Sequence, residues 1–176
     1  MHFEPTPLPG AFVIELERHQ DERGFFARTY CSSEFEEQGI NTDWPQCNTS
    51  FNLRAGTLRG MHWQADPHAE VKLVRCTAGA IYDVIVDLRP DSSTRLHHFG
   101  VALTAENRKQ LYIPKGFAHG FITLSDDTEV FYHMGSSYVP GSAQGARHDD
   151  PAFAIEWPRP VEVISERDAT YPDYSA

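Results

Sequence analysis

Two histidines lie in short motifs whose residue types could support catalysis. His119 ends the pattern P-x-G-x-x-H, which begins at Pro114, and His62 lies in the run GMHWQ. Imidazole is a general acid or base near neutral pH and also a common metal ligand. A first-row metal needs three or four converging ligands, and the run around His62 supplies no second histidine. Two histidines are too few to predict a metal site, so a metal-dependent enzyme is kept only as an alternative.

One segment places carboxylates on a regularly alternating strand. In residues 81–88, Asp83 and Asp87 share a face with Ile81 and Ile85, because side chains on a strand alternate between its two faces. Small β-barrels often direct such a mixed face at a ligand cavity, whereas the simpler explanation is that the face meets water. The pattern alone slightly favours the solvent-facing interpretation.

The elements that must position these side chains are short strands. Segments rich in β-branched and aromatic residues alternate with Gly, Pro and Asp, which is typical of all-β sandwiches and barrels. One helix is predicted, because Ser33 and Glu36 form an S-x-x-E capping box and Gly39 supplies a stop. After Pro140 the periodicity is lost, which predicts irregular wrapping. We therefore predict a single all-β domain over residues 1–176. The predicted strands are 11–16, 25–30, 46–53, 57–64, 71–77, 81–88, 96–103, 110–113, 118–124 and 129–134.

The composition excludes several classes of protein. The 176 residues include 15 Lys and Arg against 25 Asp and Glu, a formal net charge of −10. Such a balance argues against duplex nucleic acid as a partner, because affinity for DNA comes largely from basic side chains. No run approaches the roughly 18 apolar residues of a membrane span, and residues 1–10 lack a signal-peptide pattern. We therefore expect a cytoplasmic protein that binds neither nucleic acid nor membrane.

The histidine motifs resemble those of known families. The pattern ending at His119 is similar to the second signature of the cupin superfamily, whose double Greek-key barrel often holds a metal. The runs TLRGMHWQ (57–64) and KLVR (72–75) resemble L-R-G-L-H-x-Q and K-L-V-R of the dTDP-4-dehydrorhamnose 3,5-epimerase family. Further matches follow in the family's order and cover most of the chain. They are D-x-R-G-x-F at 21–26, Q-x-N-x-S at 46–50, D-V-x-V-D-L-R at 83–89, I-P-x-G-F-A-H-G-F at 113–121, D-D-P at 149–151, W-P at 157–158 and S-x-x-D at 165–168.

The resemblance implies both a fold and a reaction. The fold is a double-stranded β-helix, a cupin-like jelly-roll barrel with short flanking helices. The reaction inverts carbons beside the keto group of a nucleoside-diphosphate 4-keto-6-deoxy sugar, without a metal or redox cofactor. By motif position, His62 is the base, and Asp168 holds its imidazole in the required tautomer. Lys72 and His119 lie near the developing enolate oxygen, and Tyr132 returns a proton from the opposite face.

Substrate binding must solve an electrostatic problem. A protein of net charge −10 repels a diphosphate unless local cations dominate within a Debye length of about 8 Å. The resemblance also implies a homodimer in which N-terminal strands cross to the partner and serve its pocket. The implied substrate-binding residues are Arg23 and Arg59 for phosphate, Phe26 or Tyr138 for stacking on the base, and Gln46 and Asn48 for hydrogen bonds to sugar or base.

Four positions depart from the family pattern. Arg28 stands where an acidic residue is usual, Ala143 replaces a glutamate, His148 replaces an aromatic residue, and His133 stands where lysine is common. We expect these changes to affect contacts with the nucleotide or sugar rather than proton transfer. They leave open which nucleotide base and sugar are used and how many carbons are inverted. They also motivate a second alternative, a sugar-nucleotide binding protein that has lost catalysis.

Overall fold

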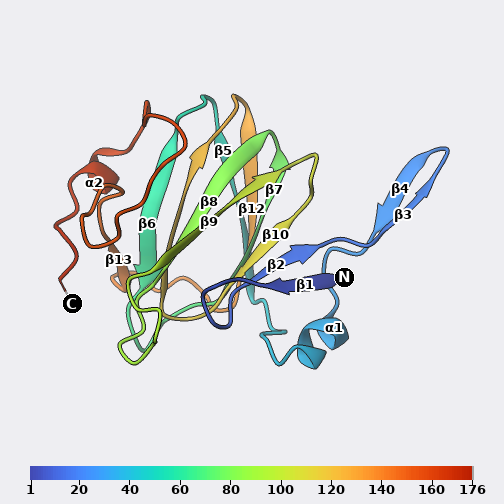
Figure 1. Ribbon diagram of the computed structural model, residues 1–176, viewed down its shortest axis with the longest axis horizontal. Coiled ribbons are helices and arrows are strands. Elements are labelled where there is room, and N and C mark those ends of the chain that lie inside the picture. The colour runs from blue at the N-terminus through green and yellow to red at the C-terminus, as the bar shows by residue number, and fades with distance from the viewer. Residues whose placement is uncertain (176) are drawn as a thin grey trace.

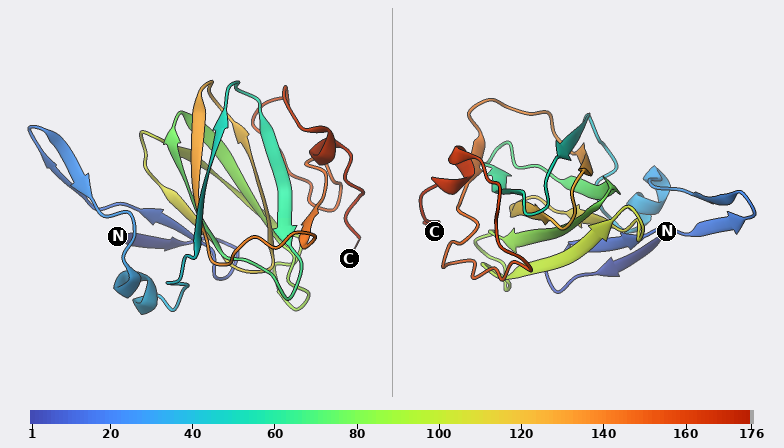
Figure 2. Two further views of the ribbon diagram at one scale, coloured as in Figure 1. Left: turned by 180° about the vertical axis from the view of Figure 1, so that it is seen from behind. Right: turned by 90° about the horizontal axis from the view of Figure 1, so that it is seen from above.

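Two antiparallel sheets packed face to face form the body of the protein, which the computed structural model describes over residues 1–175 (Figures 1 and 2). The first sheet has the order β1 (His2–Pro5), β2 (Phe12–Glu15), β10 (Gln110–Ile113), β7 (Lys72–Ala78), β12 (Thr128–Met134) and β5 (Gln46–Asn52). The second has the order β13 (Ala143–Gly145), β6 (Leu58–Gln64), β11 (Phe117–Thr123), β8 (Ala80–Asp87) and β9 (His98–Thr104). Neighbours in each sheet are mostly distant in sequence, and the predicted all-β jelly-roll fold is confirmed.

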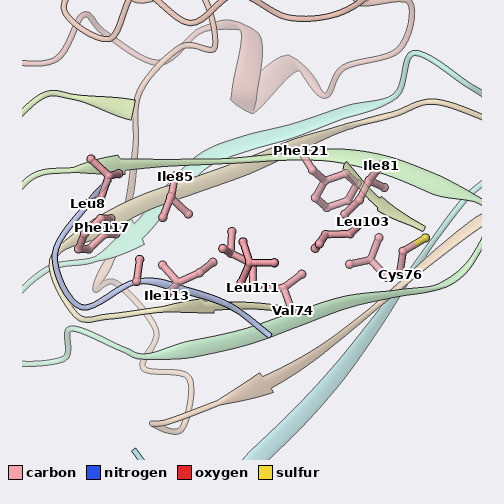
Figure 3. Close-up of a cluster of buried hydrophobic side chains, with 13 residues drawn as sticks. Leu8, Val74, Cys76, Ile81, Ile85, Leu103, Leu111, Ile113, Phe117 and Phe121 are labelled. Atoms are coloured by element: carbon pink, nitrogen blue, oxygen red, sulfur yellow. The ribbon is translucent and has the colours of Figure 1, made fainter. Parts of the chain in front are cut away.

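The main hydrophobic core fills the space between the two sheets. Figure 3 shows side chains from both layers directed into this space, among them Val74 of β7, Leu111 of β10, Ile85 of β8 and Phe121 of β11. Each of these four is at most 1% exposed. Close packing of this kind fixes the spacing of the sheets, since protein interiors are packed as densely as organic crystals.

The carboxylate-bearing face of β8 lies inside this core. Asp83 and Asp87 have no exposed surface, so the expectation that this face meets water is wrong. A buried carboxylate must be paired, and both are: Asp83 contacts His119, while Asp87 accepts hydrogen bonds from Arg89 and from the hydroxyl of Thr94. The alternation itself is as predicted, but an alternating pattern does not determine whether a mixed face meets water or the protein core.

All ten predicted strands are present with shifts of a few residues at their ends, and β1, β3 (Arg18–Asp21) and β13 were missed. β3 consists of polar, exposed residues, and β1 ends in proline. Neither has the apolar alternation that identifies a half-buried strand. No helix in the described part of the chain is long and apolar enough to span a membrane. The cytoplasmic location remains a prediction from the sequence.

The helix α1 (Ser32–Glu37) lies where a helix is predicted, but it begins differently. Its N-cap is Cys31, which makes no side-chain capping bond, and the Ser33 hydroxyl lies 3.1 Å from the Cys31 sulfur. The predicted capping box is therefore wrong. The stop is confirmed: Gly39 has φ of 67°, and the N–H groups of Gly39 and Ile40 donate to the last turn in a Schellman pattern. A second short helix, α2 (Glu166–Ala169), agrees with the short flanking helices that the resemblance implies, although the sequence did not predict its position.

The hairpin of β3 and β4 (Gly24–Ala27) projects from the body of the protein, at the opposite end from α2 (Figure 1). Seven of its eight strand residues are exposed, and Phe26 is 75% exposed. The hairpin therefore adds nothing to the core of its own chain.

Candidate active site

A cavity of about 660 Å³ opens between the two sheets and the C-terminal segment. β5, β7 and β12 of the first sheet form one wall, β6 and β11 of the second form the other, and α2 lies at the rim. A second cavity of about 700 Å³ lies beside Trp63 and contains none of the predicted site residues. The predicted site residues that line the first cavity are Asn48, Arg59, His62, Lys72, His119, Tyr132 and Asp168.

His62 and Asp168 form a hydrogen-bonded pair. The Nε2 atom of His62, on β6, lies 2.7 Å from Oδ1 of Asp168, on α2. The other carboxylate oxygen accepts from the backbone N–H of Gly60 at 3.3 Å, and Ser165 caps α2 by accepting from the N–H of Asp168. Burial acts to raise the pKa of Asp168, but the bonds from His62 and Gly60 outweigh it and hold this pKa below its ordinary value of 3.8.

This geometry makes His62 suitable as a base. Asp168 remains ionised at neutral pH and accepts the Nε2 proton, so the lone pair of the imidazole is on Nδ1. When Nδ1 takes up a proton, the adjacent carboxylate stabilises the imidazolium that forms. The hydrogen bond therefore fixes the tautomer of His62, and the Asp168 carboxylate provides a negative charge next to the ring.

We expect Asp168→Asn to lower the free energy of unfolding at neutral pH by about 1–3 kcal/mol, because it removes the charged acceptor from two hydrogen bonds, one buried and one partly buried. The pKa of Asp168 is depressed in the folded protein. Its contribution is thus present above the pKa of the unfolded chain and is lost as pH falls through the folded value. Urea denaturation at neutral and acidic pH measures this loss, with Asp91→Asn, at an exposed position, as the matched control. A destabilisation of the same size at both pH values would contradict the assignment.

A second histidine and carboxylate pair faces His62 across the β6–β11 ladder, where His62 and His119 are direct partners. Nε2 of His119 lies 2.7 Å from Oδ1 of Asp83, and the two side chains are 6% and 0% exposed. The ring of His119 also lies edge-on to that of Tyr132, with centroids 6.4 Å apart. Asp83 does not itself line the cavity, and its hydrogen bond holds the ring of His119, which does.

Tyr132, on β12, faces the cavity from the first sheet. Its hydroxyl lies 3.0 Å from the hydroxyl of Ser50 on β5. Burial raises the pKa of Tyr132 well above its ordinary value of 10, and the contact with Ser50 only partly opposes this shift. The phenol is therefore protonated at neutral pH and can act as a proton donor. Because His62 belongs to the second sheet, its imidazole and the phenol of Tyr132 come from opposite walls of the cavity.

Three cationic side chains complete the lining: Arg167 comes from α2, and Lys72 and Arg59 come from the two sheets. Nζ of Lys72, the first residue of β7, lies 3.0 Å from a carboxylate oxygen of Glu70. The Nε of Arg59, on β6, donates to the side-chain oxygen of Asn52 at 2.7 Å. That bond leaves donors of the guanidinium available, and a guanidinium can bind phosphate oxygens through two parallel hydrogen bonds.

Four predicted site residues do not line this cavity. Gln46 lies beside it, because its side chain donates to Asn48 at 3.0 Å and accepts from the backbone N–H of Tyr138 at 3.1 Å. Arg23 and Phe26 lie on the projecting hairpin, where Arg23 is ion-paired with Asp21 and its side chain is 84% exposed. Within one chain, Arg23 and Phe26 contribute nothing to the cavity.

In the described part of the chain, the side chains that commonly bind metals do not form a cluster. Among residues 1–175, no group of three or more His, Cys, Asp or Glu side chains is placed to hold an ion. His62 and His119 lie close together, but each is already bonded to its own carboxylate.

A family model described as dTDP-4-dehydrorhamnose 3,5-epimerase matches residues 5–176. The chain belongs to this family. The dTDP-4-dehydrorhamnose 3,5-epimerase of Methanothermobacter thermautotrophicus is 42% identical over 172 residues, which are 96% of this chain and 92% of the relative. The crystal structure of the enzyme from Elizabethkingia anophelis has a TM-score of 0.95 at 38% identity, covering 99% of this chain and 96% of that one. The enzyme from Bacillus anthracis, solved with TDP and PPi bound, also has a TM-score of 0.95, at 39% identity, covering 98% of this chain and 99% of that one.

The positions at which the sequence departs from the family pattern lie outside the cavity lining of this chain. Arg28 forms an ion pair with Glu34 at 2.8 Å beside α1, and Ala143 pairs with Gln64 at the edge of the second sheet. His148 accepts a hydrogen bond from Trp157 through its carbonyl oxygen. The cavity lining that the chain shares with the family motifs is thus unaffected by these changes.

Several partners of the site residues were not selected from the sequence. Ser50 and Asp83 both stand in the family motifs. Strand alternation places Ser50 on the same face as Asn48, and Asp83 on the same face as Ile85. For Ser50, which lines the cavity, this alternation was a sufficient signal, whereas for Asp83 it left open whether the face meets water or the core. Glu70 and Asn52 carry no comparable signal, because their roles depend on contacts with Lys72 and Arg59 that only the folded chain shows.

Proposed function

We propose that this family member is a cofactor-independent epimerase of a dTDP-4-keto-6-deoxy sugar. The observation that carries the proposal is that a carboxylate-backed imidazole and a protonated phenol line one cavity from opposite sheets. Inversion at a carbon beside a ketone requires a base on one side of the sugar and an acid on the other. The match over residues 5–176 supports a single domain for this activity.

The reaction follows from these positions. His62 removes the proton from the carbon beside the keto group, and the electron pair of the C–H bond moves toward the keto oxygen to form an enolate. Lys72 and His119 stabilise the negative charge on that oxygen, as preorganised donors do in oxyanion holes. Tyr132 then donates its proton to the opposite face of the carbon, so that the configuration is inverted. Solvent returns the enzyme groups to their starting protonation states.

The nucleotide is proposed to be dTDP. The Bacillus anthracis relative is described with TDP and PPi bound, and Arg59 stands in a family motif at the cavity wall with free donors for a diphosphate. Asn48 lines the same cavity and, with Gln46 and Tyr138, supplies polar and aromatic groups beside it for the sugar or base.

We further propose a homodimer in which the hairpin of one chain reaches the site of the other. The exposed phenyl rings of Phe25 and Phe26, 40% and 75% exposed, have no core in their own chain to cover them. Sedimentation analysis tests the assembly, with Phe26→Ser expected to weaken it. A wild-type chain that sediments as a monomer at micromolar concentration would refute the dimer but not the proposed chemistry.

The experiment that tests the function is incubation with dTDP-4-keto-6-deoxyglucose in heavy water. We expect deuterium at one or both carbons beside the keto group and inversion of configuration, followed by NMR and mass spectrometry. Activity that survives removal of metals by a chelator counts against a metal-dependent enzyme. Binding of dTDP by the folded protein without any exchange would show instead a binding protein that has lost catalysis.

A further inference from the structure

Behind Lys72 lies a buried chain of polar side chains that the proposed reaction does not yet use. The side chains of Lys72 and Glu70 are only 10% and 9% exposed, and Nζ of Lys72 is 3.0 Å from Oε1 of Glu70. The other oxygen of Glu70 accepts a hydrogen bond from Gln64 at 2.6 Å. The Gln64 side-chain oxygen in turn accepts from the hydroxyl of Ser142 at 2.6 Å. Both carboxylate oxygens of Glu70 are therefore engaged, and the carboxylate is fixed in orientation.

The pairing of Lys72 with Glu70 repeats an arrangement found at both histidines of the cavity. His62 and His119 each have a buried carboxylate behind them, Asp168 and Asp83. Lys72 has Glu70 in the corresponding place. A buried ammonium without a counter-charge is costly, and a lysine side chain has four flexible bonds that must be ordered before it can point at one atom.

The ion pair with Glu70 leaves capacity for a ligand. An ammonium group has three N–H donors, and one carboxylate oxygen occupies one of them. The remaining donors belong to a side chain that lines the cavity. Glu70 itself is not part of the cavity lining, so it acts on a substrate only through Lys72.

We propose that Glu70 is a positioning residue that holds the Lys72 ammonium at the site where the enolate oxygen develops, with Gln64 and Ser142 as its support. The inference rests on the proposed function for its kinetic consequences, but the placement of Lys72 by Glu70 is a property of the folded chain alone.

A kinetic double-mutant cycle tests the first part. Glu70→Gln keeps the shape and can still accept from Gln64, so we expect a folded enzyme whose kcat falls roughly 10- to 100-fold, because small displacements of a catalytic group cost this much. KM should stay nearly unchanged, and Glu70→Asp should restore part of kcat. In a Lys72→Met background, Glu70→Gln should have little further effect, because the two residues act as one unit. An equal loss of kcat in both backgrounds, or no loss at all, overturns the proposal.

A chemical measurement tests the placement without any activity. The lysines of the chain are Lys72, Lys109 and Lys115, so mass spectrometry can follow each one during acetylation by an N-hydroxysuccinimide ester. We expect Lys72 to be acetylated several-fold faster in Glu70→Gln than in wild type, relative to the exposed Lys115. Equal relative rates in the two proteins overturn the proposal. If wild type fails to epimerise any dTDP-4-keto-6-deoxy sugar, the proposed function is wrong, and the acetylation rates still decide the role of Glu70.

Discussion

His62→Asn lowers kcat for epimerisation by about 10²–10⁴-fold, the usual contribution of a general base. Asparagine is too short to replace the Nε2–H that contacts Asp168, but the carboxylate keeps its hydrogen bond from the backbone N–H of Gly60, so we expect the variant to stay folded. Deuterium incorporation beside the keto group should fall by the same factor as inversion, since both require removal of the same proton. Binding of dTDP, measured by calorimetry, should be nearly unchanged.

The matched control for this variant is His68→Ala, because His68 is exposed and does not line the cavity. It should retain wild-type kcat and KM. If His62→Asn keeps turnover within a few-fold of wild type while His68→Ala does the same, His62 is not the base, and the reaction must begin with another group.

Tyr132→Phe should separate proton removal from proton return. The substitution deletes only the hydroxyl that contacts Ser50, so His62 can still abstract a proton and return one from solvent to the same face. We expect net inversion to fall by about 10²-fold or more, the usual contribution of a general acid, while exchange of the abstracted proton with heavy water continues. NMR of the recovered substrate measures exchange, and the ratio of epimers measures inversion.

For Tyr132→Phe the control is Tyr174→Phe, which removes a hydroxyl from a tyrosine outside the cavity lining. That variant should behave as wild type. Exchange and inversion that fall equally in Tyr132→Phe would show that the phenol serves proton removal or substrate binding and not reprotonation.

The all-β class was predictable because most strands carry a strong local signal, whereas the jelly-roll arrangement followed from the family resemblance. β8 and β11 alternate or run continuously apolar between turn residues, and both were recognised. β3 was missed because all four of its residues are exposed, so no burial pattern exists to be detected. The capping box failed because the structure begins the helix two residues earlier than the motif requires, with Cys31 rather than Ser33 as N-cap.

The site was predictable from ordered motifs but not from individual residues. The motifs placed His62, Tyr132 and Asp168 on elements that prove to surround one cavity. Local alternation could not decide whether Asp83 meets water or core, because that depends on which sheet packs against β8. Likewise, Glu70 gives no sign in the sequence that its carboxylate reaches Lys72. Arg23 and Phe26 could not be tested in the same way. They lie on the projecting hairpin, and in a single chain they do not reach the cavity.

The proposed division of acid and base between the two sheets has a mechanical consequence. His62 is carried by β6 of one sheet and Tyr132 by β12 of the other, so the gap across which a sugar ring must fit depends on how far apart the packed interior holds the two sheets. Side chains such as Ile85 and Leu111, which belong to the same core cluster but to different sheets and do not line the cavity, act as spacers between the two sheets. A smaller or larger side chain at such a position therefore changes the distances from both His62 and Tyr132 to the sugar, although the substituted residue itself does not contact the sugar.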